Sequence, residues 1–142
     1  MSNVVQIIVG PVGSVPALAE EVAGLMHLGR PWEVQETPFP RVSINAPERH
    51  VWLVFLPTYL LADPTFGDVP DWLAPERYDA YIDVGAIRDR PWPEHEQLRD
   101  RFVAELFDAL KAAGRYRLYL VSNVQEPLKE YDPFVDAGQP PL

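Results

Sequence analysis

Residues 93–122, PEHEQLRDRFVAELFDALKAAGRYRLYLVS, contain the strongest pattern in the chain, a long amphipathic helix followed by a strand. Apolar side chains recur there at intervals of three and four, which is the spacing of one helix face. Gly114 ends the pattern, as glycine does after many helices, and the alternating segment 115–122 predicts a strand. The predicted helix runs from Pro93 to Ala113, and its apolar face consists of Leu98, Phe102, Leu106, Phe107 and Leu110.

A second strand and helix open the chain. Residues 3–9, NVVQIIV, are β-branched and apolar, which predicts a buried strand. Ser14 can cap a helix that has Pro16 in its first turn, and Gly29 with Pro31 ends it. The apolar face of this helix consists of Val15, Leu18, Val22, Leu25 and Met26.

The middle of the chain is rich in β-like segments. Residues 32–37 and 41–45 alternate between polar and apolar side chains, and residues 50–56, HVWLVFL, are almost continuously apolar. A continuous apolar run is typical of a central strand that is covered on both faces. Residues 78–87 alternate again, which places Tyr78, Ala80, Ile82 and Val84 on one face and Asp79, Tyr81 and Asp83 on the other.

Residues 57–76 contain four prolines and a glycine, which exclude a long helix or a central strand. The segment also carries five large apolar side chains, so we expect an ordered loop that packs on the body, with single helical turns near Tyr59 and Trp72. The segment from Pro127 to Leu142 shows no pattern and predicts an irregular tail.

The order of predicted elements is β-α-β-β-β-loop-β-α-β. This order predicts one α+β domain over residues 1–126, with an irregular tail over 127–142. We expect one mixed sheet of about six strands, with both helices packed on one face. The ferredoxin-like fold is one arrangement of this kind.

Charge is the second distinctive property. The chain has 12 basic and 21 acidic side chains, a formal net charge of −9. Residues 61–110 hold twelve of the acids against five arginines, so most of the excess falls in one third of the chain. Nucleic acids and anionic membranes bind through lysine and arginine clusters, so we expect neither as a partner. A basic protein partner fits this charge better.

The sequence contains no chemistry-bearing motif. The absence of cysteine excludes disulfides, thiolate nucleophiles and cysteine metal sites. The turn GPVGS at 10–14 lacks the lysine of a phosphate loop, and no G-x-S-x-G motif is present. No apolar run is long enough for a membrane span, and the N-terminus does not match a secretory signal. We therefore expect a cytoplasmic protein with no catalytic residue, metal or cofactor.

Acidic and aromatic side chains lie together in the most acidic part of the chain. Tyrosine and tryptophan supply binding energy in interfaces, and surrounding acids steer a basic partner. The leading hypothesis is a binding protein that occludes a basic partner such as a toxin domain, as immunity proteins and antitoxin-type inhibitors do. Two alternatives stay open: a small-molecule enzyme or sensor with a pocket under the aromatic loop 57–76, and a subunit of a larger assembly. The candidate contact residues are Asp68, Asp71, Trp72, Asp79, Tyr81, Asp83, Trp92, Glu94, Glu96 and Asp100.

Overall fold

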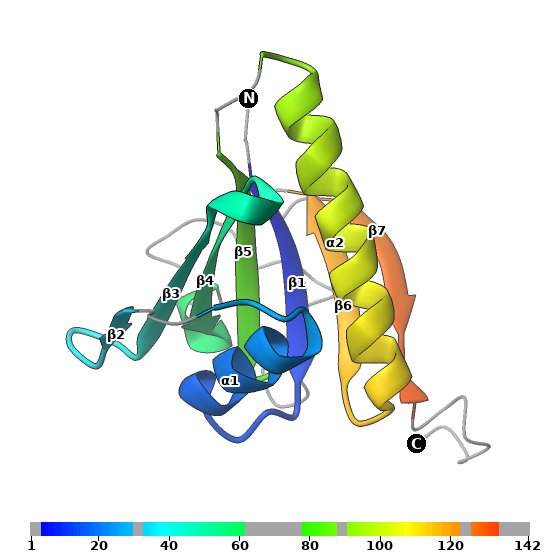
Figure 1. Ribbon diagram of the computed structural model, residues 1–142. Helices are drawn as coiled ribbons and strands as arrows, with labels where there is room; N and C mark the ends of the chain where they lie inside the picture. The colour runs from blue at the N-terminus through cyan, green and yellow to red at the C-terminus, as the bar shows by residue number, and fades with distance from the viewer. Residues whose placement is uncertain (1–3, 30–32, 62–77, 88–90, 123–125, 134–142) are drawn as a thin grey trace.

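A computed structural model describes residues 4–29, 33–61, 78–87, 91–122 and 126–133. Within these residues the chain forms an α+β fold, one seven-stranded sheet with two α-helices (Figure 1). The strands are β1 (Val4–Gly10), β2 (Glu33–Gln35), β3 (Arg41–Ala46), β4 (Val51–Pro57), β5 (Ala80–Ala86), β6 (Arg117–Ser122) and β7 (Glu126–Tyr131). The helices are α1 (Val15–Leu25) and α2 (Glu94–Ala113), and two short 3-10 helices are η1 (Pro47–Arg49) and η2 (Thr58–Leu60).

The sheet is antiparallel throughout its described length, in the order β2-β3-β4-β5-β1-β6-β7. The expectation of a mixed sheet is therefore wrong, and the ferredoxin-like order is not confirmed. After α1 the chain continues with β2 at the far edge of the sheet. The strands β2, β3, β4 and β5 follow one another as a meander, and β5 pairs with β1 antiparallel. β5 and β6 lie on either side of β1. The connection from β5 to β6 through α2 therefore crosses over β1. Periodicity in the sequence predicts strands but not which strands become neighbours.

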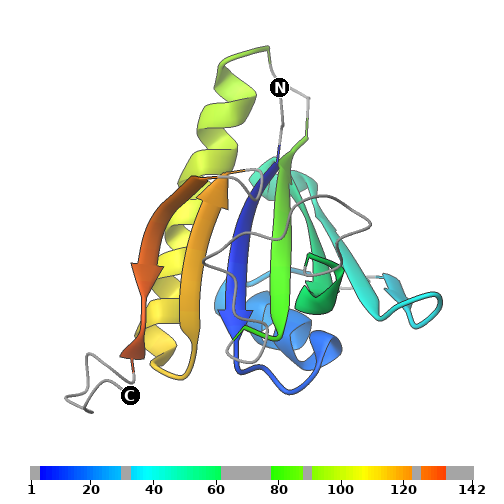
Figure 2. The same cartoon turned by 180° about the vertical axis from the view of Figure 1, so that it is seen from behind.

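Both helices lie on the same face of the sheet, as Figures 1 and 2 show from opposite sides. The Ser14 hydroxyl caps α1 by accepting a hydrogen bond from the Ala17 amide at 3.2 Å. Gly114 ends α2 in the left-handed conformation, with φ of 71°. These two boundaries follow from local sequence signals.

The main core lies between the helices and the sheet. Ile7, Phe55 and Ile82 project from central strands and are fully buried there. Facing them are the buried side chains of the two helices, Leu18 and Val22 from α1 and Phe102, Val103, Leu106, Phe107 and Leu110 from α2.

The apolar face of α2 differs from the expected one near its beginning. Leu98 is only half-buried, whereas His95 and Arg99 are each 7% exposed. Arg99 lies three and four residues before Phe102 and Val103, which places it on the face that packs against the sheet. A charged residue therefore stands where the sequence pattern predicted only apolar ones.

The other face of the sheet carries a second apolar cluster, which we call the back-face cluster. Its buried members are Ile8, Leu56, Tyr78, Tyr81 and Val121. Strands β1, β4 and β5 are thus buried on both faces, which explains the nearly continuous apolar run of residues 50–56.

Two segments differ from the sequence prediction. Tyr78 precedes β5 and packs in the back-face cluster, although simple alternation placed it with Ala80 on the core face. Residues from Glu126 to Tyr131 form β7 where an irregular tail was expected to begin at Pro127. β7 is an edge strand that pairs with β6, and an edge position tolerates a proline such as Pro127. Because proline is rare in strands, the sequence of this segment gives only a weak strand signal. The expected helical turn at Tyr59 is η2, whereas Trp72 lies outside the described residues.

Candidate functional site

The predicted contact residues fall into three sets. Asp68, Asp71 and Trp72 lie outside the described residues. Asp79, Tyr81 and Asp83 belong to β5 and the residue that precedes it, and Trp92, Glu94, Glu96 and Asp100 belong to the beginning of α2 and the residues before it.

Asp79 holds the loop between β1 and α1. Its carboxylate accepts hydrogen bonds from the Val12 amide at 3.0 Å and from the Gly13 amide at 3.3 Å. Gly13 has φ of 81°, a conformation that glycine adopts without strain. The amides that a phosphate-binding loop would offer to an anion are therefore occupied by a carboxylate of this chain.

Tyr81 and Asp83 lie on the back face of the sheet, away from the helices. Tyr81 is 6% exposed, and burial, with the Asp83 charge as a smaller cause, raises its pKa. The Asp83 carboxylate accepts a hydrogen bond from Gln6 Nε2 at 2.7 Å, across the β1–β5 pairing in which these residues are directly opposite. Burial raises the pKa of Asp83, and the bond from Gln6 lowers it by less.

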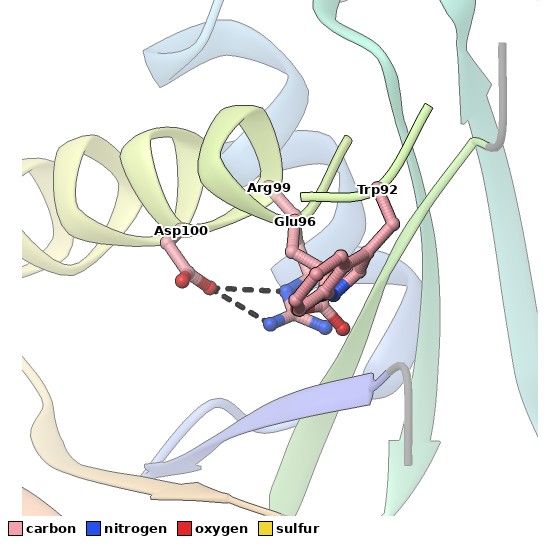
Figure 3. A network of polar contacts seen from close by, with 4 residues as sticks. All are labelled: Trp92, Glu96, Arg99 and Asp100. Carbon is pink, nitrogen blue, oxygen red and sulfur yellow. Dashed lines mark hydrogen bonds and ion pairs between the residues drawn. The ribbon is translucent and has the colours of Figure 1, made fainter. Parts of the chain in front are cut away.

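The beginning of α2 presents a different arrangement, which Figure 3 shows from close by. Trp92 is 65% exposed, and its Nε1 donates a hydrogen bond to Glu96 Oε2 at 3.0 Å. The Asp100 carboxylate accepts hydrogen bonds from Arg99 Nε at 3.1 Å and Nη2 at 2.9 Å, and 62% of its side chain remains exposed. We call Trp92, Glu96 and Asp100 the Trp92 surface.

Glu94 does not join the Trp92 surface. Residues two apart on a helix point about 200° apart, so Glu94 projects from a different side of α2 than Glu96. Glu94 and Glu96 both lie in the first turn of α2, where carboxylates interact favourably with the helix dipole.

The strand residues and the Trp92 surface do not form one continuous face. Tyr81 packs in the back-face cluster, and Asp83, two residues further along β5, projects from the same face of the sheet, opposite to the helices. Asp79 precedes β5 and Trp92 follows it, so the seven residues of that strand, roughly 23 Å, separate them. A single partner surface that contacts Trp92, Glu96 and Asp100 therefore leaves the strand residues uncovered.

A cavity of about 580 Å³ lies beside the β1–α1 loop. It extends from this loop and the first turn of α1 to β2, with Pro57 and Asp79 on its floor. Its walls are mainly valines and prolines, and its charged side chains are Glu36 and Asp79. This composition favours a neutral or cationic occupant.

Arg99 is the residue at this site that the sequence analysis missed. It is buried and charged, and only two of its three guanidinium nitrogens find hydrogen-bond partners among the described residues. Its spacing from Phe102 and Val103 was visible in the sequence. The geometry of its guanidinium was not, because it depends on how closely α2 packs on the sheet.

No family model matches the chain, and neither the curated proteins nor the solved structures give a match. Among the described residues, no three histidine or acidic side chains group as metal ligands. The described helices include none that is long and apolar enough to span a membrane.

Proposed function

We propose that this chain is a non-catalytic, acidic binding protein that occludes a basic protein partner. The observation that carries the proposal is the Trp92 surface, where an exposed indole is held by Glu96 beside the exposed carboxylate of Asp100. The most specific form of this function is an immunity or antitoxin-type inhibitor that neutralises a bacterial toxin.

Trp92 has the properties of an interface anchor. Tryptophan is enriched among the residues that dominate binding energy, because it buries a large area with few rotatable bonds. The hydrogen bond from Nε1 to Glu96 restricts the indole before any partner arrives. A restricted side chain loses less entropy on binding, so the arrangement favours affinity.

The charge of the chain supports a basic partner. A net charge of −9 accelerates association with a positively charged protein at low ionic strength. Toxins that act on nucleic acids carry basic clefts, so an acidic protein with an aromatic anchor is physically suited to block one.

A capture experiment with designed variants tests the proposal. The tagged chain serves as bait in lysate of the source organism, with washes at low and then moderate salt, followed by mass spectrometry. We expect one stoichiometric basic protein that is released as salt rises, whose own activity the purified chain inhibits. Trp92→Ala should weaken its binding by tenfold or more.

Matched variants separate charge from position. Glu96→Gln keeps an acceptor for Trp92 Nε1 but removes the charge, so it should slow association and reduce its salt dependence. Asp108→Asn makes the same change of charge on α2, about 18 Å further along the helix, and should leave binding unchanged. A partner that binds Trp92→Ala and Glu96→Gln as tightly as the wild type would show that another surface makes the contact.

A second candidate function is a small-molecule enzyme or sensor. The cavity of about 580 Å³ beside the β1–α1 loop favours it, because its volume lies within the usual range for small-molecule pockets, roughly 300–1,000 Å³. The pocket that the sequence analysis expected under residues 57–76 lies largely outside the described residues. Saturable changes in tryptophan fluorescence during a screen of cationic and neutral metabolites would support this function over the first.

A further inference from the structure

The cavity beside the β1–α1 loop has apolar walls and only negatively charged side chains in its lining. α1 and β2 border it (Figure 1), and its volume of about 580 Å³ suits a small organic molecule. Val34 of β2 lines it and is 50% exposed, so a ligand with an apolar body would remove an apolar side chain from water. The apolar wall consists of Val12, Val15, Pro16, Val34, Pro40 and Pro57.

Asp79 is an exposed carboxylate on the floor of this cavity, so a ligand in the cavity can reach it. The Val12 and Gly13 amides donate hydrogen bonds to it, but these amides carry no net charge. A carboxylate offers about four acceptor sites, so the two amides leave room for a further donor. The carboxylate of Asp79 is therefore held in place while its charge stays uncompensated.

No cation among the described residues pairs with either acid of the lining. Asp79 and Glu36 form no ion pair there, and Arg41 donates its hydrogen bond to Gln35, a neutral lining residue. The two carboxylates give the lining a formal charge of −2. The N-terminus of α1 also borders the cavity, and its dipole, equivalent to roughly +0.5 charge, offsets only part of this.

This charge selects the class of ligand. An anion is repelled by both carboxylates, whereas a cation is attracted more strongly than in bulk water, because the apolar walls lower the local dielectric. A metal ion fits less well, since Ca²⁺ and Mg²⁺ take about six or more oxygen ligands. The described residues contain no group of three histidine or acidic side chains that could hold one.

We propose that the cavity binds a small organic ammonium ion with an apolar body. The ammonium group donates a charge-assisted hydrogen bond to Asp79, Glu36 adds a second negative charge, and the apolar body packs on Val15 and Val34. The proposal gives the ligand class of the second candidate function and rests on that function. The site is separate from the Trp92 surface.

Three ligands that share a phenyl ring and differ in charge test the proposal by ¹H–¹⁵N NMR of the full chain. Phenethylammonium should give saturable shifts of the Val12, Gly13 and Val34 amides, with a Kd about tenfold or more below that of neutral 2-phenylethanol. The anion 3-phenylpropanoate should not bind, and ammonium chloride at the same concentration should not reproduce the shifts.

The outcomes separate the ligand class from the function of the cavity. If 2-phenylethanol or 3-phenylpropanoate binds as tightly as phenethylammonium, the cation site is refuted, although the cavity remains a small-molecule pocket. If none of the three gives saturable shifts, or if ammonium chloride gives the same ones, the proposal is wrong. The wider metabolite screen then decides whether the cavity has another ligand.

Variants identify the anchor. Asp79→Asn keeps an oxygen acceptor for the loop amides but removes the charge, so it should weaken phenethylammonium binding about tenfold or more and leave 2-phenylethanol binding unchanged. Glu36→Gln, at an exposed position, should weaken phenethylammonium binding about threefold. Glu33→Gln makes the same change of charge on β2 outside the lining and should have no effect. Unchanged affinity in a folded Asp79→Asn, or in Glu36→Gln where the first does not fold, would overturn the proposal.

Discussion

Gly85 is required in β5 because the Trp52 indole lies directly over it. The two residues are paired across the β4–β5 ladder, on the back face of the sheet. A Cβ built on Gly85 would lie 2.0 Å from Trp52 Cζ2 and 2.1 Å from Cε2. Carbon atoms pack at about 3.5–4.0 Å, so in Gly85→Ala the ring must retreat by roughly 1.5–2 Å.

The cost of this retreat follows from the area that the ring uncovers. An aromatic side chain buries about 150–250 Å², so one face accounts for roughly 75–125 Å². At about 25 cal/mol per Å², Gly85→Ala should lower the free energy of unfolding by about 2–3 kcal/mol. The melting temperature of a chain of this size should then fall by roughly 8–12 °C.

A double-mutant cycle attributes the cost to the indole. In a Trp52→Ala background the space over Gly85 is open, so Gly85→Ala should be neutral or stabilise by up to about 1 kcal/mol through reduced entropy of the unfolded chain. Gly24→Ala is the matched control, because no atom beyond its chain neighbours and the backbone of its own helix lies within 4 Å of a Cβ built at this position. It should be neutral or slightly stabilising.

Urea unfolding followed by far-ultraviolet circular dichroism measures all these variants without relying on tryptophan emission. The expected coupling energy between the two positions is about 3 kcal/mol. An equal cost of Gly85→Ala in both backgrounds would refute the contact between Trp52 and Gly85 as its cause.

Two further changes test the roles of the strand carboxylates. Asp79→Ala should lower the free energy of unfolding by about 1 kcal/mol, since the Val12 and Gly13 amides lose their acceptor, and Asp79→Asn should cost less; urea unfolding equal to the wild type would contradict this role. Asp83→Asn keeps the acceptor for Gln6 but cannot ionise, and burial raises the pKa of Asp83 in the folded state. The wild type should therefore lose stability relative to Asp83→Asn as pH rises from about 4 through that raised pKa, and the difference should stay constant below the pKa of the unfolded chain; a difference that grows toward acid pH would contradict the buried carboxylate.

The elements of this fold were largely predictable because their signals are local. The apolar spacing of α2, the Ser14 cap of α1 and the left-handed Gly114 each depend on a few neighbouring residues. Weak local signals gave the errors: β7 is an edge strand that contains Pro127, and Tyr78 lies just before β5, where alternation no longer applies.

The candidate site was only partly predictable. Trp92, Glu96 and Asp100 lie close together because they fall within two or three turns at the beginning of one helix, whereas Glu94, predicted with them, projects from another side of α2. The same reasoning grouped them with Asp79 and Asp83, which the fold places at the far end of β5 and on the opposite face of the sheet.

The sequence by itself therefore determined the helices, most strands, the acidic charge and most of the buried face of each helix, with Leu25 and Leu98 as exceptions. Only the tertiary structure decided the antiparallel strand order, the pairing of Asp83 with Gln6, the contact of Asp79 with the β1–α1 loop and the burial of Arg99. The Asp83–Gln6 and Asp79–Val12 bonds join residues that are 77 and 67 positions apart in the chain. Such contacts form only when the whole sheet assembles, because periodicity specifies which way a side chain points but not what it meets.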